Sequence, residues 1–387
     1  MKFAQEYRDP VLAQGLLVRL RTEVARTAAT RARPLHVMEV CGGHTHSIFR
    51  HGLQDLVPPE IEFIHGPGCP VCVLPMGRVD DCIAIAEQPG VILTTFGDAM
   101  RVPGTKKSLL QAKAEGADIR LVYSPLDALA IARRTPDRRV VFFALGFETT
   151  MPSTALTVLQ AQREGIGNFS LFCNHITVPQ PIRALLDDPA MRLDGFIGPG
   201  HVSMVVGTRP FDFIPRDYGK PFVVAGFEPL DLLQSMLMVV TQIAEGRAEV
   251  ENQYARIVPR DGNRPALAAI EAVFEPRERF EWRGLGEIDA SGVKLRPAFA
   301  AYDAERLFDV GYGRRQEVAD PVDARCGDVL KGVLKPIACP LFGTVCNPET
   351  PVGALMVSSE GACAAYHQYA GARAGVQYAG ARAGVAA

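Results

Sequence analysis

The stretch that decides the fold is LHVMEVCGGHTH at residues 35–46, a short apolar run that leads into a cysteine, two glycines and two histidines. The same order returns in IEFIHGPGCPVC at 61–72. An apolar run of this length, followed by a Gly/Pro-rich loop and a helical stretch, is typical of a βα unit in a buried parallel sheet. The repetition therefore predicts an α/β protein.

Units of this kind continue to about residue 225. The expected strands are 35–40, 61–64, 91–95, 119–123, 140–145, 170–173, 195–197 and 222–225. Helices are expected between them, and those at 125–134 and 152–163 begin with a proline, which suits the first position of a helix.

Seven loops follow these strands, and the carboxyl ends of strands form the ligand crevice of open α/β sheets. We therefore expect the loops to converge. They are CGGHTH (41–46), GPGCPVC (66–72), TFGDAMRVPG (95–104), LGFETT (145–150), CNH (173–175), GPGHVS (198–203) and AGFEP (225–229).

Two short motifs occur twice: Gly-Pro-Gly at 66–68 and 198–200, and Gly-Phe-Glu at 146–148 and 226–228. We interpret them as marks of two similar βα-repeat, parallel-sheet domains that face one cleft, although Gly-Pro-Gly is also common turn chemistry. The expected domains are 31–124 and 125–250, a third α+β domain of 251–370 with 1–30, and a low-complexity tail at 371–387.

Composition excludes several classes of protein. The 387 residues carry a formal charge of −2, so no basic excess exists to bind nucleic acid. The charged residues of MKFAQEYRDP do not fit a secretory signal, and no apolar stretch is long enough to span a membrane. A cytoplasmic protein is expected, in which nine cysteines are not a disulfide framework because the cytosol keeps thiols reduced.

Four of these cysteines, Cys326, Cys339, Cys346 and Cys363, follow the spacing C-x12-C-x6-C-x16-C. Four thiolates are the ligand number of an iron–sulfur cluster or of an all-cysteine zinc site. Zinc sites usually pair their ligands as C-x2-4-C, which is absent here. The spacing therefore favours a [4Fe–4S] cluster in the third domain, with zinc or buried thiols as the alternatives.

An earlier group of residues has a different chemistry. Cys69 and Cys72 have the C-x-x-C spacing of a redox dithiol, and Cys41 precedes His44 and His46 in a glycine-containing loop. A thiolate beside imidazoles suits a soft transition metal held transiently. Half of a zinc knuckle, or simple packing of these residues, are the alternatives.

Other polar residues give weaker indications. His175, His201, Glu148 and Glu228 are candidates for the cleft or for structural roles, Asp98 and Arg101 for partner binding or loop shape, and Cys82, Cys173 and Trp282 for packing. No phosphate-binding P-loop, dinucleotide fingerprint or nucleophile elbow occurs in the sequence.

Taken in order, CGGHTH, GPGCPVC, LGFETT, GPGHVS and AGFEP, followed by the spacing of the four late cysteines, resemble the HypD family of [NiFe]-hydrogenase maturation factors. The resemblance extends over about residues 30 to 370. It implies a scaffold, not a turnover enzyme, on which the Fe(CN)2CO moiety of the hydrogenase is assembled. It also implies a small HypC-like chaperone and a HypE-like donor of cyanide as partners.

The resemblance assigns roles to individual residues. Cys41 is implied as the thiolate that binds the transient iron, with His44 beside it, and Cys69 and Cys72 as the redox dithiol. The four late cysteines are implied as ligands of a [4Fe–4S] cluster that supplies electrons, with Glu360 as a secondary candidate near the last of them. An iron–sulfur disulfide reductase of the ferredoxin–thioredoxin reductase kind is the alternative function, and a zinc-stabilised binding module is a third.

Overall fold

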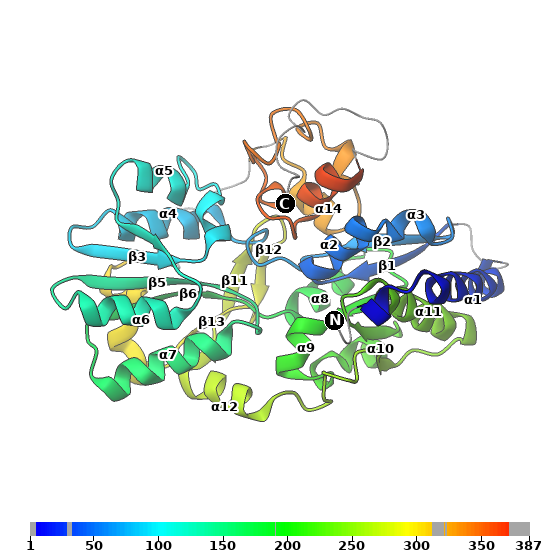
Figure 1. Cartoon of the computed structure of the whole chain (residues 1–387), viewed down its shortest axis with the longest axis horizontal. Helices are drawn as coiled ribbons and strands as arrows, with labels where there is room; N and C mark the ends of the chain where they lie inside the picture. The colour runs from blue at the N-terminus through cyan, green and yellow to red at the C-terminus, as the bar shows by residue number, and fades with distance from the viewer. Residues whose placement is uncertain (1–4, 29–32, 190, 312–320, 322, 371–387) are drawn as a thin grey trace.

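Two parallel β-sheets form the centre of the molecule in the computed structural model, which describes residues 5–28, 33–189, 191–311, 321 and 323–370. Sheet A has the strand order β2-β1-β7-β8-β9 and sheet B the order β4-β3-β5-β6 (Figure 1). The strands are β1 (Leu35–Glu39), β2 (Ile61–His65), β3 (Val91–Thr95), β4 (Ile119–Leu121), β5 (Arg139–Gly146), β6 (Phe169–His175), β7 (Gly195–Pro199), β8 (Phe222–Ala225) and β9 (Val250–Asn252).

The strands are apolar because helices cover both faces of each sheet. Every residue of β3, β6, β7 and β8 is buried, and the register of β5 with β6 runs from Val140↔Phe169 to Gly146↔His175. All eight strands predicted from the apolar runs are present within a few residues, so the predicted α/β class is confirmed.

The chain does not build the sheets one after the other. It lays down β1 and β2, crosses to build all of sheet B, and returns for β7, β8 and β9. Boundaries at 31–124 and 125–250 therefore do not follow the sheets, because β3, which pairs with β4, also pairs with the later strand β5 in sheet B. Both Gly-Pro-Gly motifs also lie at strands of sheet A, the first directly after β2 and the second across the end of β7 and the start of α9.

The helices pack as layers on these sheets. They are α1 (Pro10–Ala28), α2 (Gly42–His51), α3 (Leu53–Leu56), α4 (Met76–Ala86), α5 (Leu109–Ala114), α6 (Pro125–Arg134), α7 (Met151–Glu164), α8 (Pro179–Asp187), α9 (Gly200–Val206), α10 (Phe213–Tyr218), α11 (Pro229–Glu245), α12 (Arg264–Val273), α13 (Ala304–Leu307), α14 (Cys326–Leu330) and α15 (Ala362–Ala365). Short 3-10 turns lie at Gln5–Arg8, Gly97–Arg101, Arg209–Phe211, Pro297–Tyr302, Pro336–Ala338 and Ala354–Met356, and a π turn at Tyr366–Ala370. In the described residues, none of the helices combines the length and apolarity that a membrane crossing needs.

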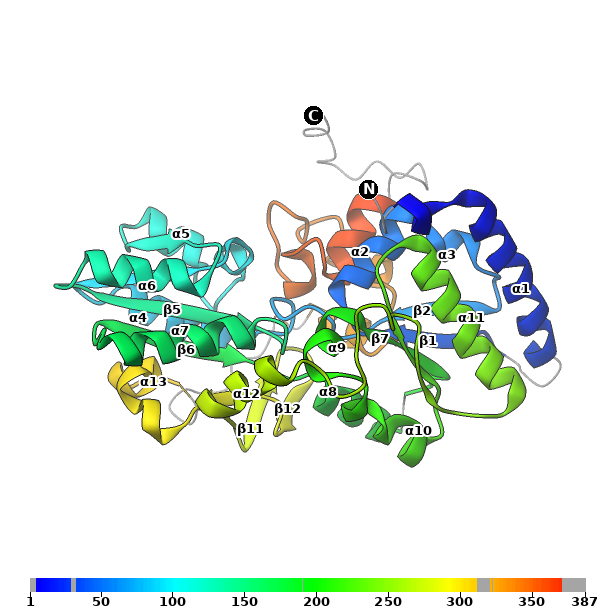
Figure 2. The same cartoon turned by 60° about the horizontal axis from the view of Figure 1, so that its bottom comes forward.

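The amino-terminal helix belongs with sheet A and not with the carboxyl-terminal region. Leu17, Leu20 and Val24 of α1 share a core with Leu233 and Met236 of α11, and the two helices run side by side (Figure 2). The expected grouping of residues 1–30 with 251–370 is therefore wrong for the described part of α1.

Residues 251–370 are divided between two places. Helix α12 packs on α7, and the antiparallel pair β10 (Phe274–Pro276) with β13 (Val293–Leu295) lies beside β6 of sheet B. The antiparallel pair β11 (Arg279–Trp282) with β12 (Gly286–Asp289) contacts α8. The segment from α14 to α15 instead lies over α2 and β2 of sheet A, in orange and red at the top of Figure 1. The low-complexity tail at 371–387 lies outside the described residues.

Candidate functional site

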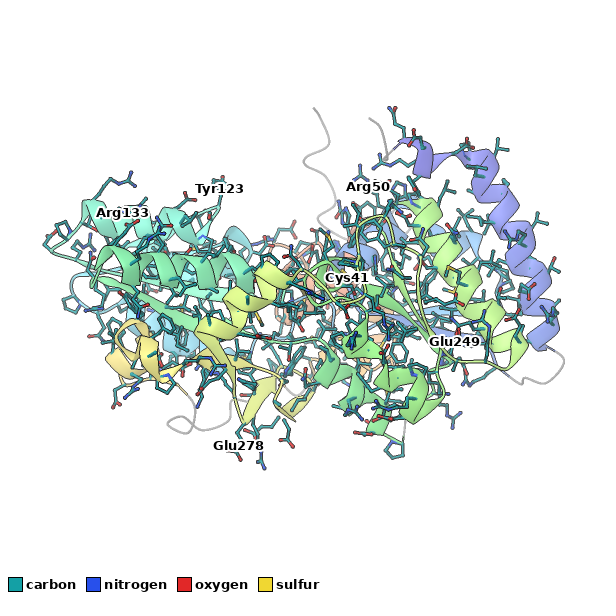
Figure 3. The ribbon with its side chains drawn as sticks, turned by 90° about the horizontal axis from the view of Figure 1, so that it is seen from below. Cys41, Arg50, Tyr123, Arg133, Glu249 and Glu278 are labelled. Atoms are coloured by element: carbon teal, nitrogen blue, oxygen red, sulfur yellow. A yellow bond between two sulfur atoms is a disulfide. The ribbon has the colours of Figure 1, made fainter. Side chains whose placement is uncertain are left out.

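A cleft of about 220 Å³ opens between the two sheets, where the carboxyl ends of their strands meet. Five of the seven predicted loops line it, namely those after β1, β2, β3 and β5 and the GPGHVS loop of β7. Glu360 adds a carboxyl group from the carboxyl-terminal segment. Cys41 lies at this central position, between the two halves of the molecule (Figure 3). The loops at 173–175 and 225–229 do not line the cleft.

Cys41 is fixed at the N-cap of α2. Its backbone N–H donates to Glu39 Oε2 at 2.9 Å, and the neighbouring Gly42 N–H donates to the Gly68 carbonyl at 2.8 Å. Glycine is required at Gly68, since a methyl group there would overlap the backbone of Cys41 and lie 2.5 Å from its Cα. The GPGCPVC loop thus touches the Cys41 loop directly.

The surroundings of Cys41 disfavour a free thiolate. Burial, followed by the charges of Glu360 and Glu39, raises the pKa of the Cys41 thiol to about 12, although the backbone N–H groups of Gly43 and His44 oppose the shift. The thiol is therefore protonated at neutral pH, and a metal ion that bound it would have to displace the proton.

Glu39 connects the residues beneath Cys41, a role that the sequence pattern alone did not indicate. Its fully buried carboxylate accepts hydrogen bonds from the Cys41 N–H and the Thr45 hydroxyl, and its Oε1 lies 2.8 Å from Nδ1 of His65. The available signal was a lone carboxylate inside an apolar run, LHVMEV, which a buried strand does not accommodate without partners.

Two histidines share one aromatic ring behind the cleft. Phe227 lies between His44 and His201, with ring centroids 4.7 and 3.8 Å away, and only His201 of the two lines the cleft. His44 Nε2 is 3.2 Å from the Ala225 carbonyl, and its Nδ1 has no partner among the described residues. Burial lowers the pKa of His44 to about 4, so this ring is neutral at neutral pH.

Cys69 and Cys72 are joined as a disulfide with a Cα–Cα distance of 5.3 Å, and both are buried. The carboxyl-terminal segment covers them, because a methyl group at Gly361 would lie 3.0 Å from Cys72 Sγ. The preceding residue, Glu360, lies against Gly42 in the same way. Glu360 and Gly361 therefore connect the disulfide to the Cys41 loop.

The four late cysteines line one small hollow together. Three are buried and Cys339 is half-buried. Burial, and then the neighbouring thiols, raise the pKa of Cys363 well above its ordinary value. The lining contains no carboxylate, and Arg325 is its one charged side chain, so the donor set fits a thiolate-bound metal cluster.

Nevertheless, across the described ranges no group of three or more His, Cys, Asp and Glu side chains is arranged to hold a metal ion as it stands. A third domain that carries a cluster is therefore not confirmed.

The structure gives the weaker candidates different roles. His175 is buried with Nε2 3.0 Å from Thr154 Oγ1, and Glu228 pairs with Arg8 at the start of α11. Arg101 donates to the carbonyl of Val357 at 2.8 Å and so holds the carboxyl-terminal segment, while Asp98 lines the cleft. Packing is observed for Cys82, Cys173 and Trp282, which are all buried.

Glu148 is a buried carboxyl group in the LGFETT loop. Its Oε1 accepts the N–H of Val178 at 3.0 Å, and its Oε2 has no partner among the described residues. Burial raises the pKa of Glu148 to about 7. Ionisation of Glu148 therefore costs the folded state more than the unfolded chain.

Glu148→Gln is expected to change the pH dependence of stability. Below the unfolded pKa of about 4 the carboxyl group is protonated in both states and costs nothing; stability is then lost as the pH rises through about 7. At pH 8 the amide variant should be more stable than the parent chain by about 3 kcal/mol, with the gap closing toward pH 4. Urea unfolding at both pH values measures the difference.

The matched control is Glu271→Gln, which removes an exposed carboxylate on α12. It should leave the difference between the two pH values unchanged. If the difference in unfolding free energy between Glu148→Gln and the parent chain is the same at pH 4 and at pH 8, ionisation of Glu148 does not destabilise the folded state. That result would contradict the prediction.

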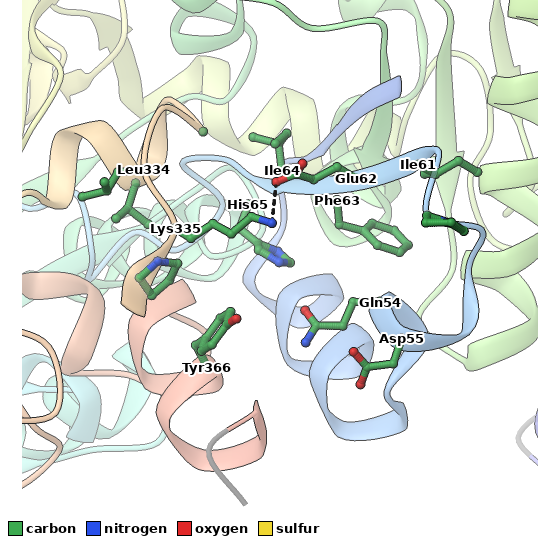
Figure 4. Close-up of a pocket in the computed structure, with 14 residues that line it drawn as sticks. Gln54, Asp55, Ile61, Glu62, Phe63, Ile64, His65, Leu334, Lys335 and Tyr366 are labelled. Atoms are coloured by element: carbon green, nitrogen blue, oxygen red, sulfur yellow. Dashed lines mark ion pairs between the residues drawn. The ribbon is translucent and has the colours of Figure 1, made fainter. Parts of the chain in front are cut away.

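A second hollow of about 270 Å³ lies along β2, the edge strand of sheet A (Figure 4). Lys335 and Glu62 form an ion pair of 3.0 Å in this hollow, and Tyr366 also lines it. Cysteine is absent from its lining, so the sulfur chemistry belongs to the cleft and to the cysteine hollow.

The fold and the site define a class: an α/β protein with a thiol-bearing cleft between two parallel sheets and a separate group of four cysteines. The HypD family, described as the hydrogenase formation hypA family, matches residues 15–370. The chain is 68% identical over 375 residues to the hydrogenase maturation factor HypD of Rhodobacter capsulatus, covering 97% of this chain and all of that protein. It is 56% identical over 369 residues to that of Escherichia coli K12, covering 95% and 98%.

A third relative, the hydrogenase expression/formation protein HupD of Azotobacter chroococcum, is 51% identical over 375 residues, with 95% of this chain and 97% of the relative covered. The chain belongs to the HypD family of hydrogenase maturation factors.

Proposed function

We propose that the protein is a scaffold on which the Fe(CN)2CO moiety of [NiFe]-hydrogenase is assembled. The observation that carries the proposal is the position of Cys41, the one thiol among the cleft residues, at the junction of five loops. The iron complex is the cargo of this cleft. Low-spin Fe(II) with cyanide and carbonyl ligands accepts soft thiolate donors, and Cys41 supplies one such donor.

The cleft needs partners to complete the cargo site. One thiolate from this chain leaves further coordination positions of the iron to a second protein, for which we propose a small HypC-like chaperone with its own cysteine. A HypE-like protein would deliver the cyanide ligands. The cleft is open to solvent, since His201 and Thr149 are exposed there, and such proteins would reach it from this side.

Cys69 and Cys72 are proposed as the redox dithiol of the scaffold. Reduction of their disulfide takes up two electrons and two protons and yields two thiols. The support is proximity: Gly68, directly before Cys69, contacts Cys41, and Glu360 and Gly361 touch both sites. The buried disulfide favours a role within the scaffold over the alternative of a reductase that turns over free disulfide substrates, because such substrates must reach the sulfur atoms.

The hollow formed by Cys326, Cys339, Cys346 and Cys363 is proposed to hold a [4Fe–4S] cluster. When bound, the cluster would supply electrons at low potential. The residues of this chain hold the thiols in place: Cys326 begins α14, Cys363 lies in α15, and Gly353 N–H donates to Cys346 Sγ at 3.5 Å.

Cys363→Ala is expected to remove most of the iron and acid-labile sulfide from anaerobically purified protein, because its buried thiol is one of the four donors that line the hollow. Iron and sulfide assays measure the loss. Cys173→Ala, which removes a buried thiol beside Val293, is the matched control and should retain both. Zinc in place of iron and sulfide would identify a zinc-stabilised module and sink the cluster assignment.

The test of the scaffold itself is anaerobic co-purification with a HypC-like protein followed by infrared spectroscopy. Cyanide and carbonyl stretching bands in the complex are the expected result. Their absence from the wild-type complex would overturn the proposed function, and multiple turnover of a free disulfide substrate would favour the reductase.

A further inference from the structure

The wall of the cleft formed by sheet B presents one side chain that has no role so far. Thr149 lies between β5 and α7, lines the cleft and is exposed, whereas its neighbours Phe147 and Glu148 are buried. Phe147 stacks on Trp282 with 6.0 Å between ring centroids, and Glu148 is held by the N–H of Val178. The loop is therefore fixed directly before Thr149, and Thr149 itself is left exposed at the cleft.

Gly146 and Thr150, which lie on either side of this loop, hold its conformation. Gly146 has φ 154°, and a methyl group there would overlap the hydroxyl of Thr150, which donates to the Phe147 carbonyl at 3.2 Å. No hydrogen bond of the Thr149 hydroxyl exists within the described part of the chain. Its proton is therefore available to a ligand in the cleft.

A second donor faces Thr149 from sheet A. His201 lines the cleft at the start of α9, and its ring is held by stacking on Phe227 with 3.8 Å between ring centroids. Desolvation in the cleft wall lowers the pKa of His201, so the ring is neutral at neutral pH. A neutral imidazole still carries one N–H donor.

The rest of the lining includes apolar side chains as well as the carboxyl groups of Asp98 and Glu360. Val40, Val71 and Phe96 contribute apolar surface to the same cleft. The cargo has matching chemistry, because cyanide bound to iron keeps negative charge and a lone pair on nitrogen and accepts charge-assisted hydrogen bonds. The oxygen of bound carbon monoxide is a poor acceptor and is better placed against apolar groups.

We propose that Thr149 and His201 each donate a hydrogen bond to one cyanide of the iron complex held at Cys41, while the carbonyl ligand faces Val40, Val71 and Phe96. The inference rests on the proposed function and assigns the recognition of its cargo. Two donors for two cyanides and an apolar wall for one carbonyl allow the cleft to sort diatomic ligands by their ability to accept hydrogen bonds.

Infrared spectroscopy of the complete chain, purified anaerobically with its HypC-like partner, tests the inference. Thr149→Val keeps the shape of the side chain and removes the hydroxyl, whereas Thr149→Ser retains the hydroxyl. We expect the cyanide bands to move to lower wavenumber in the valine variant, the carbonyl band to move less, and the serine variant to match the parent. His201→Phe and His201→Asn form the equivalent pair on the other wall.

The outcomes separate the two levels of the proposal. Wild-type protein without cyanide and carbonyl bands overturns the proposed function. Wild-type bands that stay unmoved in both Thr149→Val and His201→Phe overturn this inference alone. Failure of Thr149→Val to hold the complex, with Thr149→Ser and thermal unfolding both normal, supports it, since Thr149→Ser keeps the hydroxyl that Thr149→Val removes.

Discussion

Cys41→Ala is expected to yield a folded chain that carries none of the Fe(CN)2CO iron. No other cysteine lines the cleft, so the variant has no thiolate to replace Cys41 at that position. The loss should be complete, because His44 directs Nε2 to the Ala225 carbonyl and Glu39 is engaged by its hydrogen bonds beneath the loop. The cost in stability should be only about 1 kcal/mol, since a single buried sulfur is removed. Infrared bands and iron content per chain measure the first effect, and urea unfolding the second.

Cys82→Ala provides the matched control. Cys82 is fully buried in α4 and lies outside the cleft, so its loss should cost similar stability and leave the iron complex intact. Cyanide and carbonyl bands of wild-type intensity in Cys41→Ala would show that the cargo is held elsewhere.

Gly68→Ala is expected to disrupt the site without changing any sulfur. The added methyl group would overlap the backbone of Cys41, and backbone atoms cannot move aside as a flexible side chain can. The connection from β1 to α2 would have to shift, and the bond from Gly42 N–H to the Gly68 carbonyl would be strained. We expect a destabilisation of about 3 kcal/mol and loss of bound iron complex.

Gly77→Ala adds the same methyl group at a position with no atom within 4 Å. Because Gly77 lies in the first turn of α4, this control should be more stable than the parent by up to about 1 kcal/mol. Equal unfolding midpoints and equal iron content in the two variants would contradict the close contact at Gly68.

The apolar runs predicted the strands well, because buried parallel strands are apolar along their whole length. The short edge strand β9 was missed, since Val250 is its only apolar residue. Strand order was not predictable, because each helix can return the chain to either side of a sheet. The recurrence of Gly-Pro-Gly did not mark two similar domains. Gly66 lies against Met38 and Gly200 against the Ala225 carbonyl, so each glycine is needed where two segments of the sheet A region approach closely.

The part of the site that is built from loops at the carboxyl ends of strands could be predicted from the sequence. Cys41 and the GPGCPVC loop converge as the rule for strand carboxyl ends requires, and the four late cysteines share one hollow. The rule fails for His175, whose ring turns into the core beneath sheet B to meet Thr154. It could not find Phe227, which holds two histidines from behind the cleft, because the contact depends on side-chain packing between distant segments.

The interleaved path of the chain sets an order for its synthesis. Strand β1 pairs with β7 through Val37↔Gly195, so the wall that carries Cys41 stays incomplete until residues beyond the whole of sheet B have left the ribosome. Contacts of such long sequence separation form late in folding. Glu360 reaches the same wall later still. A partly translated chain thus has no finished cleft, so the cleft becomes able to bind a ligand only after synthesis of the chain is nearly complete.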